Sequence, residues 1–320
     1  MTLILVRASE HYITHTVDRL VTAETGGEFD PKSNKSIVYA CRDGIVSLAY
    51  TGIAFLGNIP TDQWLVEQIT GLRFDRARKL PTIGLGQNWE PTEGLGQTML
   101  RIRSALGDAV KSIPAHWMAE WQQQSFDLLV AGWHWNKRGR VRPIMAAVSK
   151  EPGHDEFRLS YHNRLWHYRR SQGTPYLVYA APSSNYSHSD IEQLNLRIAN
   201  RTWQEVESVM VDEVRRIATN NPRVGNHVLT VTLSPPKDAR GIITDHPLAP
   251  IIHPIRSSFF PELKTEVHLS PWLVGKNVIQ PPSLLSHREE VRLSDYTLIL
   301  SGSSKPGPMF FGSLQRPALK

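Results

Sequence analysis

Short apolar runs, one of them alternating strictly with polar residues, open the chain and predict β-strands. We expect strands over residues 3–8 and 12–17, joined by a short polar turn. A second pair is expected over residues 36–41 and 45–50, around the turn Arg42-Asp43-Gly44. The N-terminal part of the chain is therefore predicted to form paired strands.

Apolar residues at spacings of three and four then predict two helices, over residues 61–72 and 93–113, the first with Thr61 as its N-cap. Strand patterns follow over residues 126–135, 141–149 and 156–162. Two further helices are predicted to begin at capping boxes, Ser189-x-x-Glu192 and Thr202-x-x-Glu205. The second should end at Asn220-Asn221-Pro222, before a strand over residues 227–233.

Strands followed by two helices occur twice in this order, and a last strand follows. Such an order suits an α+β fold in which two antiparallel sheets pack face to face with helix pairs outside, a four-layer αββα sandwich. Proline becomes frequent from Pro235 onward, where 12 of the 22 prolines lie. We therefore expect one domain over residues 1–235 and a C-terminal extension of short strands and loops over residues 236–320.

Length, composition and net charge are consistent with this predicted fold. The chain has 320 residues, a net charge of +6 and ordinary apolar and charged fractions, which predict a folded protein rather than a disordered one. No apolar run is long enough to span a bilayer, and the start has no signal-peptide pattern, so we expect no membrane partner and a cytoplasmic location. Cys41, the single cysteine, is expected to be a core residue.

This order of elements resembles the sandwich of N-terminal-nucleophile hydrolases, in particular proteasome β-subunits and their bacterial relatives, over roughly residues 2 to 234. In such enzymes the first residue of the mature chain is the nucleophile. Thr2 is the candidate here, and it requires removal of Met1. Its own α-amine, with a usual pKa of about 7.7 to 8.0, would be the base that takes the hydroxyl proton.

The resemblance also implies the partners of this threonine. A carboxylate at the end of the second strand corresponds to Asp18, and a lysine at the start of the third corresponds to Lys35, with Lys32 as the fallback. Asp18 would orient Lys35, whose cation would stabilise the alkoxide. Gly52, after the fourth strand, would supply the backbone N–H of the oxyanion hole.

Two stretches depart from the family pattern. An acidic residue and a serine are expected before the late strand, but Asn221 and Val224 stand there, followed by the matching Gly225. The Ser-Gly-Ser-type element after the middle strands is altered to Ser171-Gln172-Gly173-Thr174. These changes affect the expected activity more than the expected fold.

Three functions stay open. The first is a threonine-type hydrolase of peptides or other amides. The second is a non-catalytic scaffold or assembly subunit of the same fold, and homo-oligomer formation is implied by the resemblance alone. The third, with the least support, is nucleic-acid binding through residues 133–170, where nine Lys and Arg and three acidic residues are interleaved with aromatic residues.

No cofactor or metal is expected. The 13 histidines are scattered, without His-Glu-x-x-His or Cys/His ligand spacing, and no glycine-rich phosphate loop follows a strand. His11 and His15 share a strand face but have no third ligand nearby in sequence. Each catalytic candidate also has a structural interpretation: Thr2 as an ordinary second residue, Asp18 as a strand-end ion pair and Lys35 as a turn residue.

Overall fold

We analysed a computed structural model of the chain. It describes residues 2–9, 11–22, 28–30, 33–57, 59–73, 89–113, 118, 121–137, 141–162, 176–181, 186–235, 251–252, 259–260, 265–266, 268–282, 284–285, 289–293 and 296–300. Within these residues, no helix is long and apolar enough to cross a lipid bilayer.

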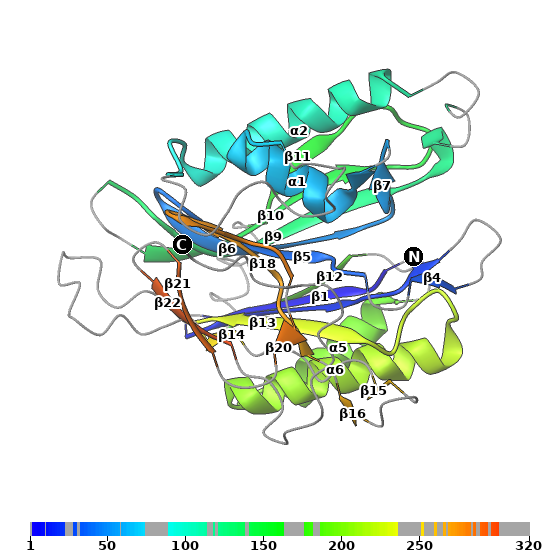
Figure 1. Ribbon diagram of the computed structural model, residues 1–320. Coiled ribbons are helices and arrows are strands. Elements are labelled where there is room, and N and C mark those ends of the chain that lie inside the picture. Colours follow the sequence, from blue (N-terminus) through cyan, green and yellow to red (C-terminus); the bar gives the residue numbers. More distant parts are fainter. Residues whose placement is uncertain are drawn as a thin grey trace.

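Two sheets stacked face to face form the centre of the molecule (Figure 1). The smaller sheet has four antiparallel strands, which in spatial order are β12 (Tyr176–Ala181), β1 (Ile4–Ser9), β2 (Ile13–Asp18) and β13 (Val228–Leu233). The larger sheet has seven, which in spatial order are β11 (Arg158–Tyr161), β10 (Val141–Lys150), β9 (Phe126–Trp135), β6 (Gly44–Thr51), β5 (Ser36–Cys41), β18 (Trp272–Gly275) and β19 (Val278–Gln280).

A pair of helices covers the outer face of each sheet (Figure 1). Helices α1 (Thr61–Thr70) and α2 (Leu95–Lys111) lie on the larger sheet, and α5 (His188–Ile198) and α6 (Trp203–Asn220) lie on the smaller one. The four layers are the predicted αββα sandwich, and the α+β fold class is confirmed.

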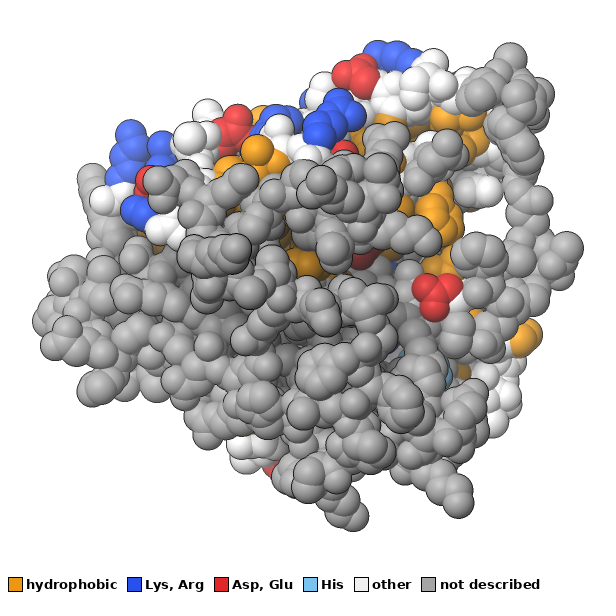
Figure 2. All heavy atoms as spheres, in the orientation of Figure 1, with side chains coloured by type: hydrophobic (Ala, Val, Ile, Leu, Met, Phe, Trp, Pro, Cys, Tyr) orange, Lys and Arg blue, Asp and Glu red, His pale blue; other side chains and the backbone are white. Residues whose placement is uncertain are grey.

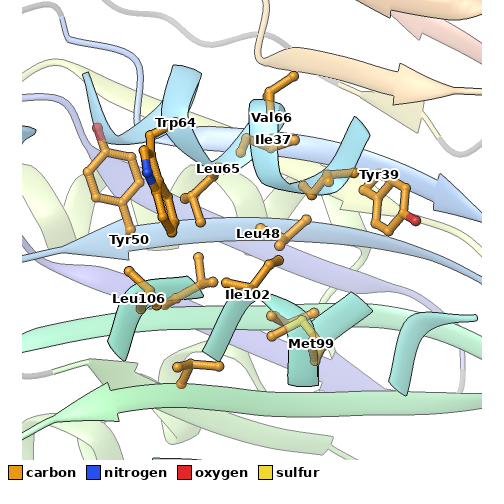
Figure 3. Packing of buried hydrophobic residues seen from close by; sticks show 14 of the residues in the cluster. Ile37, Tyr39, Leu48, Tyr50, Trp64, Leu65, Val66, Met99, Ile102 and Leu106 are labelled. Carbon is orange, nitrogen blue, oxygen red and sulfur yellow. The ribbon is translucent and has the colours of Figure 1, made fainter. Parts of the chain in front are cut away.

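Three separate groups of buried apolar side chains hold the four layers together. One lies between the larger sheet and helices α1 and α2, one between the two sheets, and one between the smaller sheet and helices α5 and α6. Figure 3 shows the first group, where Trp64 and Leu65 of α1 and Ile102 of α2 converge on Leu48 of β6. Burial of apolar area on both faces of each sheet is what fixes the stacking.

The remaining strands are short and lie around the two main sheets. They form one three-stranded sheet and four two-stranded ribbons: β14 (Ile251–Ile252) with β22 (Tyr296–Leu300) and β21 (Glu289–Leu293), β15 (Phe259–Phe260) with β16 (Thr265–Glu266), β17 (His268–Leu269) with β20 (Leu284–Leu285), β3 (Val21–Thr22) with β4 (Glu28–Asp30), and β7 (Phe55–Leu56) with β8 (Ile59–Pro60).

Two helix starts differ from the sequence prediction. Thr61 is the first residue of α1 rather than its N-cap, which is Pro60, and the Thr61 hydroxyl donates to the carbonyl of Ile53 at 2.8 Å. Helix α5 is capped by Ser187 with Asp190, two residues before the predicted box. Ser187-x-x-Asp190 and Ser189-x-x-Glu192 are overlapping Ser/acid patterns, and the helix begins at the first of them. The predicted cap at Thr202, with Glu205, is confirmed.

Three strands of the main sheets were not predicted at their positions. Strand β12 completes the smaller sheet beside β1, and β19 lies at the edge of the larger sheet beside β18. Strand β18, from the proline-rich region, joins the larger sheet in parallel with β5. Apart from this pair, the described neighbours in both main sheets are antiparallel. The domain division at residue 235 stays a prediction, although one strand beyond it pairs with a strand before it.

Candidate active site

Thr2 lies at the edge of the space between the two sheets. It lies two residues before β1. Ile4 and Val6 of that strand face the core between the sheets, while Leu5 of the strand and Leu3 just before it face helices α5 and α6. Since side chains of a strand alternate between faces, Thr2 shares the inner face with Ile4. Its side chain is buried, with 4% of the residue exposed.

Lys35, at the start of β5 in the opposite sheet, reaches this threonine. Its Nζ donates one hydrogen bond to Oγ1 of Thr2 and another to the carbonyl oxygen of Leu20. The Lys35 side chain is buried. The structure thus brings together a hydroxyl and an ammonium group that lie 33 residues apart in the sequence.

Asp18, the last residue of β2, accepts three backbone hydrogen bonds. Its Oδ1 accepts from the N–H of Leu3 at 2.7 Å, and its Oδ2 accepts from the N–H groups of Leu20 at 3.1 Å and Gly225 at 3.0 Å. Nζ of Lys35 lies 3.8 Å from the same Oδ2. One carboxylate therefore ties three chain segments together beside the Thr2–Lys35 contact.

Burial dominates the electrostatics of this pair. It raises the pKa of Asp18, and the opposing effects of Lys35 and the three backbone N–H groups do not cancel the increase. Burial also lowers the pKa of Lys35, with Asp18 acting in the opposite direction and Arg19 adding to the decrease. Both groups are therefore held closer to their neutral forms than in water. Such shifts are common where proton transfer takes place.

Gly52 follows β6 and has a backbone conformation suited to glycine. Its φ is +96°, and a Cβ at this position would lie 2.0 Å from the carbonyl oxygen of Ser125. A side chain is therefore excluded for two independent reasons. Gly52 is an exposed residue next to Thr51, which contacts Thr2 directly.

Thr51 is the site residue that the sequence analysis missed. Its Oγ1 accepts a hydrogen bond from the N–H of Thr2 at 3.0 Å and donates one to the carbonyl oxygen of Thr2 at 3.2 Å. The available signal was its place at the end of a strand, immediately before Gly52. That signal identifies the position but not its partner.

The loop after α6 contributes a backbone N–H to Asp18 and, among the described residues, no polar side chain to Thr2. Gly225 donates to Asp18, and a Cβ on it would lie 2.6 Å from Cβ of Leu20. Asn221 instead accepts from the N–H of Arg223 at 3.0 Å, and Val224 is buried against the helix-side core. Among the described residues, neither Asn221 nor Val224 makes a polar contact with Thr2.

Several other candidates can be placed. Cys41 is buried in the core, as expected, and burial raises the pKa of its thiol to about 12. In the part of the chain that the structure describes, no group of three or more His, Cys, Asp and Glu side chains could hold a metal ion. Lys32 and residues 171–174 lie outside the described residues.

The basic and aromatic stretch does not form one described surface. Trp133 is buried between the sheets, and its Nε1 donates to the carbonyl oxygen of Leu233 at 2.9 Å. Lys137 is exposed at the hairpin end, while Arg138, Arg140 and residues 163–170 lie outside the described residues. On the upper face in Figure 2, Lys and Arg side chains alternate with Asp and Glu rather than gathering.

Comparison with known proteins identifies structural neighbours only. No protein-family model matches the chain, and no curated protein matches it in sequence. Similar solved structures include Anbu (ancestral beta-subunit) from Yersinia bercovieri, at 12% identity and a TM-score of 0.43, with 77% of this chain and 86% of that chain covered.

Two further neighbours are of the same kind. The helical assembly of the Anbu complex from Pseudomonas aeruginosa matches at 9% identity and a TM-score of 0.45, over 73% of this chain and 81% of that one. Eukaryotic HslV from Trypanosoma brucei matches at 11% identity and a TM-score of 0.38, over 72% and 99%. The neighbours are proteasome-type proteins of the N-terminal-nucleophile superfamily, the group that the sequence resemblance named.

Proposed function

We propose that this protein is a threonine-type N-terminal-nucleophile hydrolase of peptide or other amide bonds, with Thr2 as nucleophile once Met1 is removed. The observation that carries the proposal is the hydrogen bond from Nζ of Lys35 to Oγ1 of Thr2, with Asp18 beside it. A cation held against a hydroxyl stabilises the alkoxide that attacks a carbonyl carbon.

In the proposed reaction, the α-amine of Thr2 both accepts the proton that is removed and returns it, so no other base is required. The α-amine of the mature Thr2 accepts the hydroxyl proton while Oγ1 forms a bond to the substrate carbonyl carbon. The backbone N–H of Gly52 is proposed to stabilise the resulting oxyanion. The C–N bond then breaks as the α-ammonium returns its proton to the leaving amine. Water then attacks the carbonyl carbon of the threonyl ester while the α-amine accepts a proton from it. The C–Oγ1 bond breaks as the α-ammonium returns that proton to Oγ1, which releases the carboxylic acid product and restores Thr2.

Lys35 and Asp18 have different parts in this scheme. Lys35 contributes positive charge at Oγ1, and that charge also disfavours protonation of the nearby α-amine. Asp18 balances the charge of Lys35 and, through its three backbone hydrogen bonds, holds the ends of β1 and β2 in place. In this scheme Asp18 positions Lys35 and does not itself exchange a proton with the substrate.

Two measurements test the proposal. Intact-mass analysis of the purified protein should give a mass without Met1, and a β-lactone or peptide-boronate probe should then label the chain at Thr2. Thr2→Ala should abolish labelling, whereas Thr219→Ala, which removes an exposed threonine of α6, should leave it unchanged. Retention of Met1, or equal labelling of Thr2→Ala, would overturn the proposal.

A second candidate is a non-catalytic subunit of the same fold. It is favoured by the replacement of the expected polar partners by Asn221 and Val224 and by the low exposure of Thr2. The same probe experiment separates the two candidates, because a scaffold subunit that has lost Met1 would remain unlabelled. Unlabelled mature protein that assembles into a defined oligomer would support the scaffold.

In either case we propose a cytoplasmic homo-oligomer, with residues 1–235 as the hydrolase-like domain and residues 236–320 as an extension. This part of the proposal rests on the sequence resemblance. Native mass spectrometry checks it: a monomer at micromolar concentration would contradict the oligomer. Nucleic-acid binding is less well supported, because Trp133 of the basic stretch is buried between the sheets and is not accessible to a base.

A further inference from the structure

Thr51 and Thr2 are joined by two hydrogen bonds across the sandwich. Thr51 ends β6 in the larger sheet, whereas Thr2 precedes β1 in the smaller one. The nitrogen of Thr2 donates to Oγ1 of Thr51 at 3.0 Å, and the hydroxyl of Thr51 donates to the carbonyl oxygen of Thr2 at 3.2 Å. Both residues are buried, so water competes little for either bond.

The directions of these two bonds follow from counting protons. A threonine hydroxyl has one proton to donate and two lone pairs that accept. The carbonyl oxygen of Thr2 can only accept, so the single proton of Thr51 is used there. Oγ1 of Thr51 can therefore only accept from the nitrogen of Thr2.

This direction matters once Met1 has been removed. The nitrogen of Thr2 then changes from an amide to an amine, which has both N–H donors and a lone pair. Oγ1 of Thr51 accepts a hydrogen bond from one N–H of the amine and donates none to its nitrogen, so it does not occupy the amine lone pair. The lone pair stays free for the proton of Oγ1 of Thr2, the transfer on which the proposed reaction depends.

On the basis of the proposed function above, we propose that Thr51 is a positioning residue that holds the α-amino group of mature Thr2 with its lone pair free for the Thr2 hydroxyl. It contacts Thr2 in a chain where the expected acidic residue and serine are replaced by Asn221 and Val224. Because Thr51 is neutral, it anchors the amine without adding a negative charge, and a negative charge would favour the protonated ammonium form.

The test uses mature full-length protein, with removal of Met1 verified by intact mass for every variant. Thr51→Val keeps the size of the side chain but removes the hydroxyl, and Thr51→Ser keeps the hydroxyl. Thr230→Val is the matched control, because it removes a buried strand hydroxyl that pairs with Thr16 at 3.2 Å, away from Thr2. Thermal unfolding of each variant shows that it is folded.

Two readouts are measured between pH 5 and pH 9. The first is the rate of β-lactone labelling at Thr2, which we expect to fall about 10- to 100-fold in Thr51→Val. It should return to within about threefold of wild type in Thr51→Ser, since general-base catalysis depends on orientation. The second is the titration midpoint of the Thr2 α-amine, followed by NMR after isotopic labelling of that amine, which should move in Thr51→Val and not in Thr230→Val.

The outcomes separate this inference from the proposed function. If mature wild-type protein is labelled and Thr51→Val matches it in both rate and pH profile, the positioning role of Thr51 is wrong and the proposed function stands. If mature wild-type protein is not labelled at all, the proposed function is wrong, and the positioning role falls with it. An equal loss in Thr51→Val and Thr230→Val would reduce Thr51 to a structural residue.

Discussion

Asp18 and Glu213 are two buried carboxylates that differ in the number and the exposure of their positively charged partners. Among the described residues, Asp18 has one cation partner, Lys35, whose Nζ lies 3.8 Å away and is itself buried. Glu213, on α6, accepts from Nη1 of Arg197 at 2.5 Å, from Nη2 of Arg216 at 2.7 Å and from the hydroxyl of Tyr186 at 3.1 Å. The two arginine side chains are 43% and 48% exposed.

The pKa values differ accordingly. Burial raises the pKa of Asp18, and Lys35 and three backbone N–H groups do not offset it. Burial also acts to raise the pKa of Glu213, but the hydrogen bonds and charges of Arg216 and Arg197 outweigh it, so the net change is a decrease. An ion pair that fastens two helices has its carboxylate satisfied by several short contacts. The Asp18–Lys35 pair leaves its lysine free to contact a hydroxyl, which suits a reacting group.

Asp18→Asn should have the largest effect. The amide removes the charge that balances buried Lys35. Its nitrogen replaces one of the two accepting oxygens and cannot accept, so either Leu3 or both Leu20 and Gly225 lose their acceptor. We expect a loss of about 3–5 kcal/mol in the free energy of unfolding, as for other broken buried pairs, and no probe labelling at Thr2. Urea unfolding and labelling of mature protein measure both. Wild-type labelling by the variant would contradict a functional role for Asp18.

Glu207 extends the comparison to a carboxyl group without a described cation partner. The hydroxyl of Thr232 donates to it at 2.5 Å, and burial raises its pKa to about 8. Between about pH 4.5 and pH 8 the folded chain therefore binds this proton more tightly than the unfolded chain, so stability falls as pH rises through that window.

Relative to Glu207→Gln, wild type should lose about 2–3 kcal/mol of unfolding free energy between pH 5 and pH 9, because a tenfold change in proton affinity corresponds to about 1.4 kcal/mol and some of the side chain stays accessible. Denaturant unfolding of both proteins at the two pH values measures the difference. A wild-type curve parallel to that of the variant would show that Glu207 ionises freely.

Glu213→Gln should cost less than Asp18→Asn. The arginines that lose their partner are half exposed and can be hydrated, so we expect a decrease of about 1–2 kcal/mol in unfolding free energy. Because the folded-state pKa of Glu213 is lowered, its contribution is present above the usual pKa and is lost as pH falls through the folded-state value. The difference from wild type should accordingly disappear in acid.

Labelling at Thr2 serves as the second readout for Glu213→Gln and should be unchanged. Asp212→Asn is the control, since Asp212 is an exposed carboxyl group on the same helix. A decrease in Thr2 labelling in Glu213→Gln alone would mean that the helix-side ion pairs and the candidate site are coupled, and the contrast between the two carboxylates would fail.

Trp272→Phe should have the smallest effect. Nε1 of Trp272, in β18, donates to Oδ2 of Asp62 at 2.8 Å, and the same oxygen accepts from Nδ2 of Asn34 at 3.0 Å. Losing one of these two donors should lower the unfolding free energy by about 1 kcal/mol. Thermal unfolding checks this against Trp89→Phe, which removes a bond of 3.0 Å to the neutral carbonyl oxygen of Thr70.

The Trp272 variant also tests the reach of the candidate site. Asn34 precedes Lys35 in the chain, so the shared contact with Asp62 links β18 to the start of β5. Labelling within about threefold of wild type is expected, because Lys35 keeps its own contacts with Thr2 and Leu20. A loss as large as that of Asp18→Asn would place β18 among the elements that hold the site.

Local pattern predicted most of the helices and strands. Period-two and period-3.6 spacing located β5, β9, α2 and α6 closely, because burial of one face imposes that spacing on any sequence that forms the element. It did not locate β12 at its position or predict the parallel partner of β5, since pairing depends on which edges meet in space.

The sequence by itself determined that a threonine, an aspartate and a lysine stand at the ends of strands, in an order that resembles a known family. Only the tertiary structure decided that their side chains meet, because Thr2 and Asp18 belong to one sheet and Lys35 to the other, and the stacking of the two sheets sets their distances. The same stacking brings in Thr51, which lies 49 residues from Thr2 in the sequence. A hydrogen bond requires two groups within about 3 Å, and no local pattern specifies that separation across a core.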